Sequence, residues 1–125
     1  MRLKEKISTS KFIKTDDFQW VQKIDENTFR LIQVTECLGT YDISEGVVPV
    51  DTLDQDEIRE ALHPFGYRDM EQVREEYGKA ANQILAECVF ESEASPFLTF
   101  QTEREAMDYV NRYIELHGQD EEETK

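Results

Sequence analysis

Residues 20–34 read WVQKIDENTFRLIQV, and this stretch decides the fold. Apolar and polar side chains alternate on both sides of a short polar segment, residues 25–27 (DEN). A period of two is typical of β-strands that bury one face. Asn also tolerates the left-handed backbone that closes a short hairpin loop. The stretch therefore predicts a hairpin with strands at about 18–24 and 28–37, joined by a three-residue turn.

The alternation also predicts which side chains lie under helices. We assign Phe29 and Leu31 to the covered face and expect Trp20 or Phe29 to be largely buried there. The opposite face then carries a mixed set of side chains: Gln19, Val21, Lys23, Arg30, Ile32 and Val34. This set is too apolar for a fully solvated face, so we expect the N-terminal segment or a partner to cover it.

A third strand is expected at about 40–50, where Gly46 suggests a bulge or bend and Pro49 suggests the strand end or a sheet edge. Three consecutive antiparallel strands form a meander. The segment before residue 17 is ambiguous, because KEKI is compatible with a helix start and KFIKT with a short strand.

After residue 50 the apolar period changes from 2 to 3.6, which indicates helices. Asp54 and Glu57 have capping-box spacing for a helix that ends before Pro64. Asp69 is expected to cap a longer helix at about 69–88, with Gln72 in the matching position. Its apolar residues form a single stripe: Met70, Val73, Tyr77, Ala81, Ile84, Leu85 and Cys88.

The residues FLTFQ (97–101) predict a fourth strand, and Thr102 with Glu105 predicts a capped last helix that ends at Gly118. The element order β-β-β-α-α-β-α favours an α+β fold: an antiparallel meander sheet with helices packed on one face. We expect a single domain over residues 1–118 and a disordered acidic tail over 119–125.

The charge balance restricts the partners. The 125 residues carry a net charge of −14, with +4 in residues 1–14 and −18 in the rest. Such a field repels nucleic acid and anionic membranes and attracts basic protein surfaces. No apolar run approaches the roughly 20 residues of a membrane span, and no signal peptide is visible. We therefore expect a cytoplasmic protein that binds neither membrane nor nucleic acid directly.

The sequence contains no recognisable catalytic, metal or cofactor motif. Cys37 and Cys88 lie in apolar-patterned segments, so we expect two buried free thiols. His63 and His117 each have a structural explanation at a helix end. Neither HxxxH, CxxC, EF-hand nor phosphate-loop spacing occurs. We therefore assign no catalytic residue, metal ligand or cofactor.

Acidic residues instead recur on every expected helix. The candidate partner-binding set takes five of them from the long and the last helices: Glu71, Glu75, Glu76, Glu105 and Asp108. The sequence hypothesis is a non-catalytic acidic interaction domain that binds a basic surface of a partner protein, and a nucleic-acid-binding protein is one candidate for that partner. Two alternatives are a DNA-mimicking inhibitor of such a protein and a small enzyme with a Cys/His cleft. The oligomeric state is left open.

Overall fold

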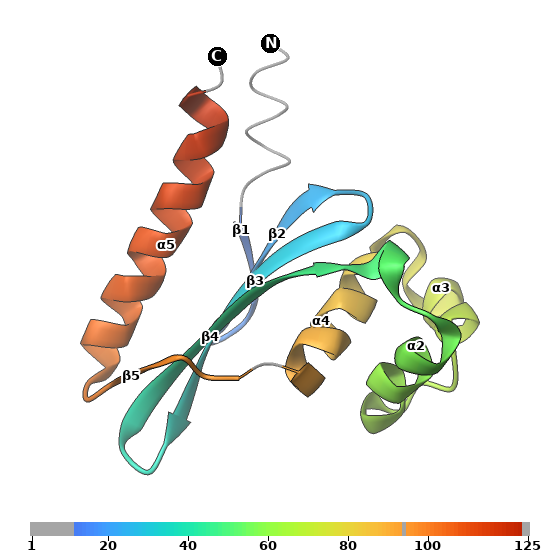
Figure 1. The fold of residues 1–125 in the computed structure, drawn as a ribbon, viewed down its shortest axis with the longest axis horizontal. Coiled ribbons are helices and arrows are strands. Elements are labelled where there is room, and N and C mark those ends of the chain that lie inside the picture. Colours follow the sequence, from blue (N-terminus) through green and yellow to red (C-terminus); the bar gives the residue numbers. More distant parts are fainter. Residues whose placement is uncertain (1–11, 94, 124–125) are drawn as a thin grey trace.

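The computed structural model describes residues 12–93 and 95–123 and has one five-stranded antiparallel sheet in the sequential order β1-β2-β3-β4-β5 (Figure 1). The strands are β1 (Phe12–Asp16), β2 (Gln19–Asp25), β3 (Thr28–Cys37), β4 (Thr40–Pro49) and β5 (Leu98–Phe100). The predicted α+β class with an antiparallel meander is confirmed. Residues 12–15 of the KFIKT segment lie in strand β1, which the sequence had left ambiguous; residues 1–11 lie outside the described chain.

After β4, the described chain contains seven helical segments, and strand β5 lies between the last two of them. They are η1 (Val50–Thr52), α2 (Gln55–Leu62), η2 (His63–Phe65), α3 (Met70–Tyr77), η3 (Gly78–Ala80), α4 (Ala81–Glu93) and, after β5, α5 (Glu103–Glu123). Within the described chain, none of these helices combines the length and apolar character needed to cross a membrane.

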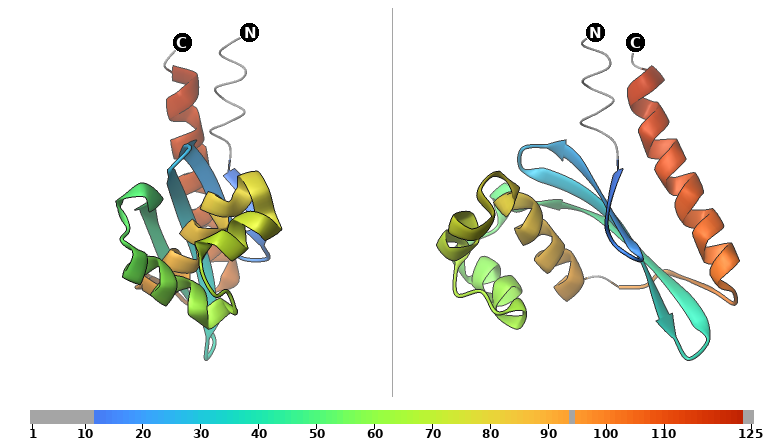
Figure 2. Two further views of the ribbon diagram at one scale, coloured as in Figure 1. Left: turned by 90° about the vertical axis from the view of Figure 1, so that its right-hand side faces the viewer. Right: turned by 180° about the vertical axis from the view of Figure 1, so that it is seen from behind.

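Helices cover both faces of the sheet, so the expectation that they share one face is wrong. Helices α2, α3 and α4 lie on one side and α5 lies on the other (Figures 1 and 2). The α4 face is built on buried residues such as Phe29 and Leu31. The α5 face is built on Ile32, Val34 and Ile43. Because β3 is apolar at odd and even positions alike, each of its faces needs its own helical cover.

The strand register corrects the face that we assigned to β2. Trp20 lies opposite Ile32, and Val21 lies opposite Leu31. Directly opposed side chains project to the same side of a sheet, so Val21 belongs to the α4 face and Trp20 to the α5 face. Phe29 is buried under the helices as predicted, with 2% of its surface exposed, whereas Trp20 is only partly buried.

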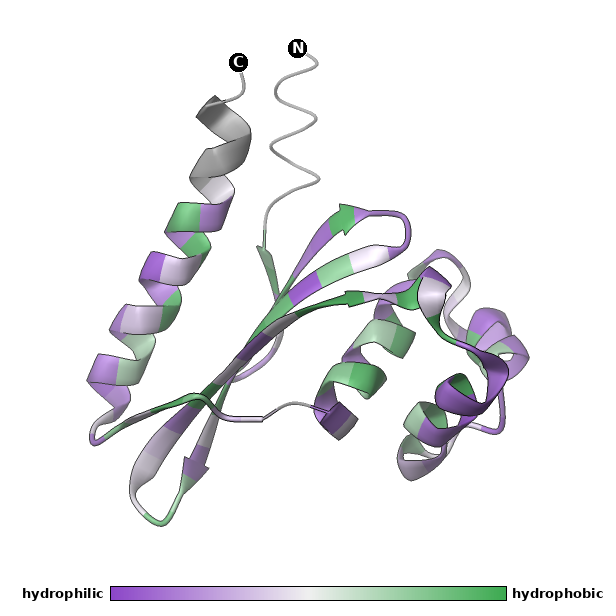
Figure 3. Ribbon diagram, in the orientation of Figure 1, coloured by the Kyte–Doolittle hydropathy of each residue, from purple (hydrophilic) through white to green (hydrophobic). Residues whose placement is uncertain are grey.

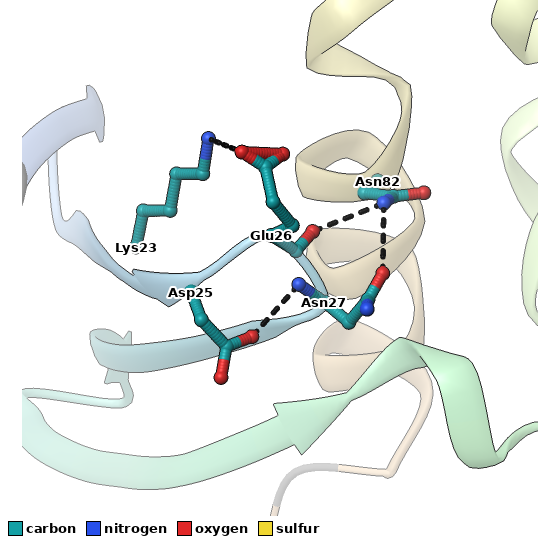
Figure 4. A network of polar contacts seen from close by, with 5 residues as sticks. All are labelled: Lys23, Asp25, Glu26, Asn27 and Asn82. Atoms are coloured by element: carbon teal, nitrogen blue, oxygen red, sulfur yellow. Dashed lines mark hydrogen bonds and ion pairs between the residues drawn. The ribbon is translucent and has the colours of Figure 1, made fainter.

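The turn of the β2–β3 hairpin is attached to α4 (Figure 4). Asp25 lies opposite Thr28, which leaves a two-residue loop instead of the predicted three. The Asn27 amide donates to Asp25 Oδ1 over 2.8 Å, and this bond lowers the pKa of the Asp25 carboxyl. Asn82 Nδ2 at the start of α4 donates to the Glu26 carbonyl over 3.0 Å. The opening hairpin therefore positions α4 against the sheet.

Gly46 does not mark a bulge, because it lies opposite Leu31 in an unbroken β3–β4 register. A Cβ atom at this position would lie 3.7 Å from Cε1 of Phe90 on α4. The missing side chain leaves room for the Phe90 ring to pack on the strand.

The predicted single helix over residues 69–88 is two helices. Its cap is confirmed, since Asp69 Oδ1 accepts from the Gln72 amide over 3.0 Å. Gly78, however, has φ +58° and ψ −121°, which ends α3 before α4 begins. The capping box of α2 is also confirmed: Asp54 and Glu57 each accept from the other's backbone amide.

The predicted end of the last helix at Gly118 is wrong. Helix α5 begins after Thr102, whose hydroxyl accepts from the Glu105 amide over 3.2 Å, and it continues to Glu123. Residues 119–123, which we assigned to a disordered tail, are therefore helical, and residues 124–125 lie outside the described chain. A glycine in the last third of a helix costs only about 1 kcal/mol relative to alanine, which does not by itself end the helix.

Candidate functional site

A row of polar side chains interrupts the apolar α4 face of the sheet. Gln19, Gln33 and Ser44 lie opposite one another on β2, β3 and β4. They are two positions along their strands from Val21 and Leu31, so they project to the same side. Gln19 and Ser44 are almost fully buried. The apolar contact between sheet and helices therefore gives way to a polar floor at this row.

Helix α4 places two carboxylates over this floor. Glu87 and Glu91 are four residues apart and lie on the same side of the helix. Gln33 Nε2 donates to Glu91 Oε2 over 2.6 Å. Gln19 Nε2 lies 3.4 Å from Glu87 Oε1 and 3.1 Å from Thr15 Oγ1. Neutral amides therefore hold both carboxylates in place.

Two adjoining clefts of about 280 Å³ and about 390 Å³ open here, and they share Asp16, Gln19 and Glu91. We call them together the acidic groove. Its charged lining residues are all carboxylates: Asp16, Asp17, Glu36, Glu87 and Glu91. Phe18, Phe65 and Tyr67 add aromatic rings to the lining, and the first two are the more exposed. The groove thus combines negative charge with accessible aromatic surface.

Glu87 is a groove carboxylate whose pKa is shifted. Burial raises the pKa of its carboxyl above the usual value, and the nearby Asp16 charge adds to the rise. Hydrogen bonds from Gln83 and Gln19 act in the opposite direction without reversing it. In residues 12–93 and 95–118, no Lys or Arg forms an ion pair with a groove carboxylate. An incoming cation would therefore stabilise the ionised form of Glu87.

The structure divides the acidic residues that the sequence singled out. Glu71, Glu75 and Glu76 are exposed on α3, in the helical layer on one side of the sheet. Glu105 and Asp108 are exposed on α5, on the opposite side (Figure 2). These two groups do not adjoin, so they do not make one acidic surface.

The two cysteines differ, which corrects the expectation that both are buried. Cys37 is exposed near the tip of the β3–β4 hairpin, whereas Cys88 is buried on α4 beside the acidic groove. No histidine lines this part of the groove. His63 is exposed, and His117 on α5 lies 2.8 Å, through Nδ1, from Nη1 of Arg30. The described chain therefore does not place a cysteine and a histidine together in the groove.

This difference predicts selective labelling of the thiols. Cys37 should react with a maleimide at the rate of an exposed thiol, and Cys88 should react only after unfolding. Burial raises the pKa of the Cys88 thiol to about 11, so at neutral pH it carries little of the reactive thiolate. Mass spectrometry of the native and the urea-unfolded protein measures both rates. Rapid native labelling of Cys88 would show that α4 is not packed as described.

Sequence reasoning missed the groove, although a signal for it was present. Gln19 and Gln33 occupy inward positions in alternating strands, where an apolar residue is expected.

In the described residues no group of three or more His, Cys, Asp or Glu side chains is arranged to hold a metal ion. No family model, curated protein or solved structure matches the chain, so its function is argued from the groove itself.

Proposed function

We propose that this chain is a non-catalytic interaction domain that binds a basic segment of a partner protein in the acidic groove. One observation carries the proposal: five carboxylates line the groove, none of them ion-paired with a Lys or Arg among residues 12–93 and 95–118, and one of them, Glu87, is half-buried with a raised pKa. Shifted titration of this kind concentrates at functional sites. A lysine or arginine side chain of a partner would supply the missing positive charge.

The groove offers such a side chain more than charge. Its carboxylates can accept charge-assisted hydrogen bonds, which are stronger than bonds between neutral groups. The rings of Phe18 and Phe65 give a cation or its aliphatic stem a surface to pack on. The net charge of −14 would speed the approach of a basic partner at low salt.

The DNA-mimic alternative is less well supported. It requires a continuous acidic surface, and the acids of α3 and α5 lie on opposite sides of the sheet (Figure 1). The enzyme alternative requires a nucleophile beside a base, and the groove pairs Cys88 with carboxylates only. Binding of a basic segment requires only the carboxylates and aromatic rings that line the groove.

Two matched variants test the proposed function. The groove variant neutralises three lining carboxylates: Asp17→Asn, Glu87→Gln and Glu91→Gln. The control neutralises three exposed α3 carboxylates: Glu71→Gln, Glu75→Gln and Glu76→Gln. Both change the net charge equally, so any difference between them reports position. The partner is recovered with the wild-type domain from lysate of its native cells, and its affinity for each variant is measured by calorimetry.

We expect the groove variant to lose at least about tenfold in affinity, because desolvated charge pairs control dissociation. The control variant should mainly slow association and flatten its salt dependence, because exposed charges act by steering. Equal losses in both variants would mean that charge acts without a defined site. A larger loss in the α3 variant would move the contact to Glu71, Glu75 and Glu76.

Folding of the groove variant can be anticipated from Glu87. Because its pKa is raised in the folded state, ionising this carboxyl opposes folding as the pH rises past the unfolded value of about 4.3. Glu87→Gln removes that penalty at neutral pH. The groove variant should therefore remain folded, and circular dichroism checks this before binding is measured.

A further inference from the structure

The tip of the β3–β4 hairpin has an unusual residue in a demanding conformation. Cys37 lies opposite Thr40, so Leu38 and Gly39 form a two-residue turn. Both have positive φ angles, +53° and +86°. Turns of this kind are dominated by Asn-Gly and Asp-Gly, because other side chains are strained in the left-handed region. In the described chain, Leu38 is the only residue other than glycine with positive φ.

Packing within the domain does not offset this strain. The Leu38 residue is 98% exposed, so its side chain gains nothing from burial. A single exposed leucine is ordinary on a protein surface. A leucine that is both fully exposed and held at positive φ pays the backbone strain without any gain from packing its side chain against the described chain. Strained residues of this kind concentrate at binding and switch sites.

The tip is continuous with the acidic groove. Glu36 is among the residues that line the groove, and its Oε2 accepts from the Gly39 amide of the tip over 3.2 Å, so the two features adjoin at this residue. The hairpin projects beyond the helices and ends in hydrophobic residues (Figure 3). From residue 31 to residue 49 its charged residues are Glu36, Asp42 and Glu45, with no Lys or Arg. An apolar tip with acidic flanks complements an apolar pocket with a basic rim.

We propose that Leu38 is the apolar anchor of the interface and inserts into such a pocket on the same partner that places a basic segment in the acidic groove. This inference rests on the proposed function for the identity of the partner. Interfaces commonly gain most of their affinity from a few buried anchors, while charges at the rim steer and orient the partner. The Leu38 side chain would supply the buried apolar anchor, and the groove carboxylates would steer and orient the partner.

Three substitutions at this residue separate anchoring from folding. Leu38→Asn suits the turn but removes the apolar side chain, so Tm should rise by about 2–5 °C while affinity for the partner falls at least tenfold. Leu38→Ala removes the anchor and keeps the left-handed strain, so affinity should fall without the rise in Tm. Leu38→Met retains apolar bulk and should keep affinity within about threefold of the wild type.

Crosslinking identifies what the tip contacts. A benzophenone maleimide is attached to the exposed Cys37, one residue from the anchor, while Cys88 is buried. After irradiation in native lysate, the crosslinked peptides are sequenced. We expect one saturable partner whose peptides combine apolar residues with Lys or Arg. Excess unlabelled wild-type domain should compete for it, and excess Leu38→Asn should not.

The outcomes separate this inference from the proposed function. If Leu38→Asn keeps full affinity while the groove variant loses it, the anchor is rejected and the groove stands. If Leu38→Asn loses affinity and the groove variant does not, the tip stands and the groove is rejected. A fall in Tm for Leu38→Asn would show that leucine suits the turn, which removes the basis of the inference. Crosslinks that no competitor reduces would also overturn it.

Discussion

Replacing Phe29 by alanine is expected to lower the free energy of unfolding by about 3–5 kcal/mol, the range for large aromatic side chains removed from cores. Phe29 is 2% exposed and is the second residue of β3, next to the two-residue turn of the opening hairpin. It belongs to the buried cluster that joins the sheet to Leu62, Val73 and Leu85 of α2, α3 and α4. Its removal leaves a cavity in this cluster. Urea denaturation followed by circular dichroism measures the loss.

Trp20→Ala is the matched comparison on the opposite face. Trp20 is only partly buried beside α5, and its ring lies 5.9 Å from the ammonium of Lys14. Because solvent already reaches this side chain, we expect a cost of about 1–2 kcal/mol, although the indole is larger than the phenyl ring. A cost for Trp20→Ala that exceeds that of Phe29→Ala would show that the α5 face, not the α4 face, contains the main core.

Gly78→Ala is expected to destabilise the protein by about 1–3 kcal/mol. Gly78 has φ +58° and ψ −121°, a combination that residues with a Cβ rarely adopt. An alanine there must either accept the strain or move α3 relative to α4. Its added methyl group meets no neighbour within 4 Å, so the effect would come from the backbone alone. Thermal unfolding of the two proteins measures the difference.

The sign of this effect distinguishes two descriptions of the segment. If residues 69–88 formed one helix, Gly78→Ala would stabilise it by about 1 kcal/mol, because alanine is the better helix former. If Gly78 separates two helices, the same change destabilises. Lys79→Ala, one residue further on at an exposed position, serves as the control and should change stability by less than about 0.5 kcal/mol. A stabilising Gly78→Ala would restore the single helix.

Features with a local cause were predictable from the sequence. Alternating side chains located β3 to the residue, and side-chain caps at Asp54, Asp69 and Thr102 located the starts of three helices. Each of these signals depends on residues within one turn or one strand. The helix break at Gly78 was not visible, because the apolar spacing continues across it from Tyr77 to Ala81. A glycine within a periodic stretch is compatible with either structure.

Features that depend on long-range pairing were not predictable in the same way. The β2–β3 register decides whether Trp20 or Val21 lies on the same face of the sheet as Phe29. A register shift of one residue would exchange the two side chains between the faces. The acidic groove needs that register and also the position of α4, which brings Glu87 to a residue 68 positions away in the chain, Gln19. Its parts were all visible in the sequence, but their proximity was not.

The passage of the chain from one side of the sheet to the other bears on how the protein is made. After α4, the polypeptide reaches the opposite side through β5, which pairs with the outer edge of β4. A ribosome completes β1 to α4 first, and domains begin to fold during synthesis. Until α5 emerges, Ile32, Val34 and Ile43 face water beside an unpaired edge strand, a combination that promotes aggregation. A chain shortened between α4 and β5 would retain this state permanently, so premature termination there should yield insoluble product.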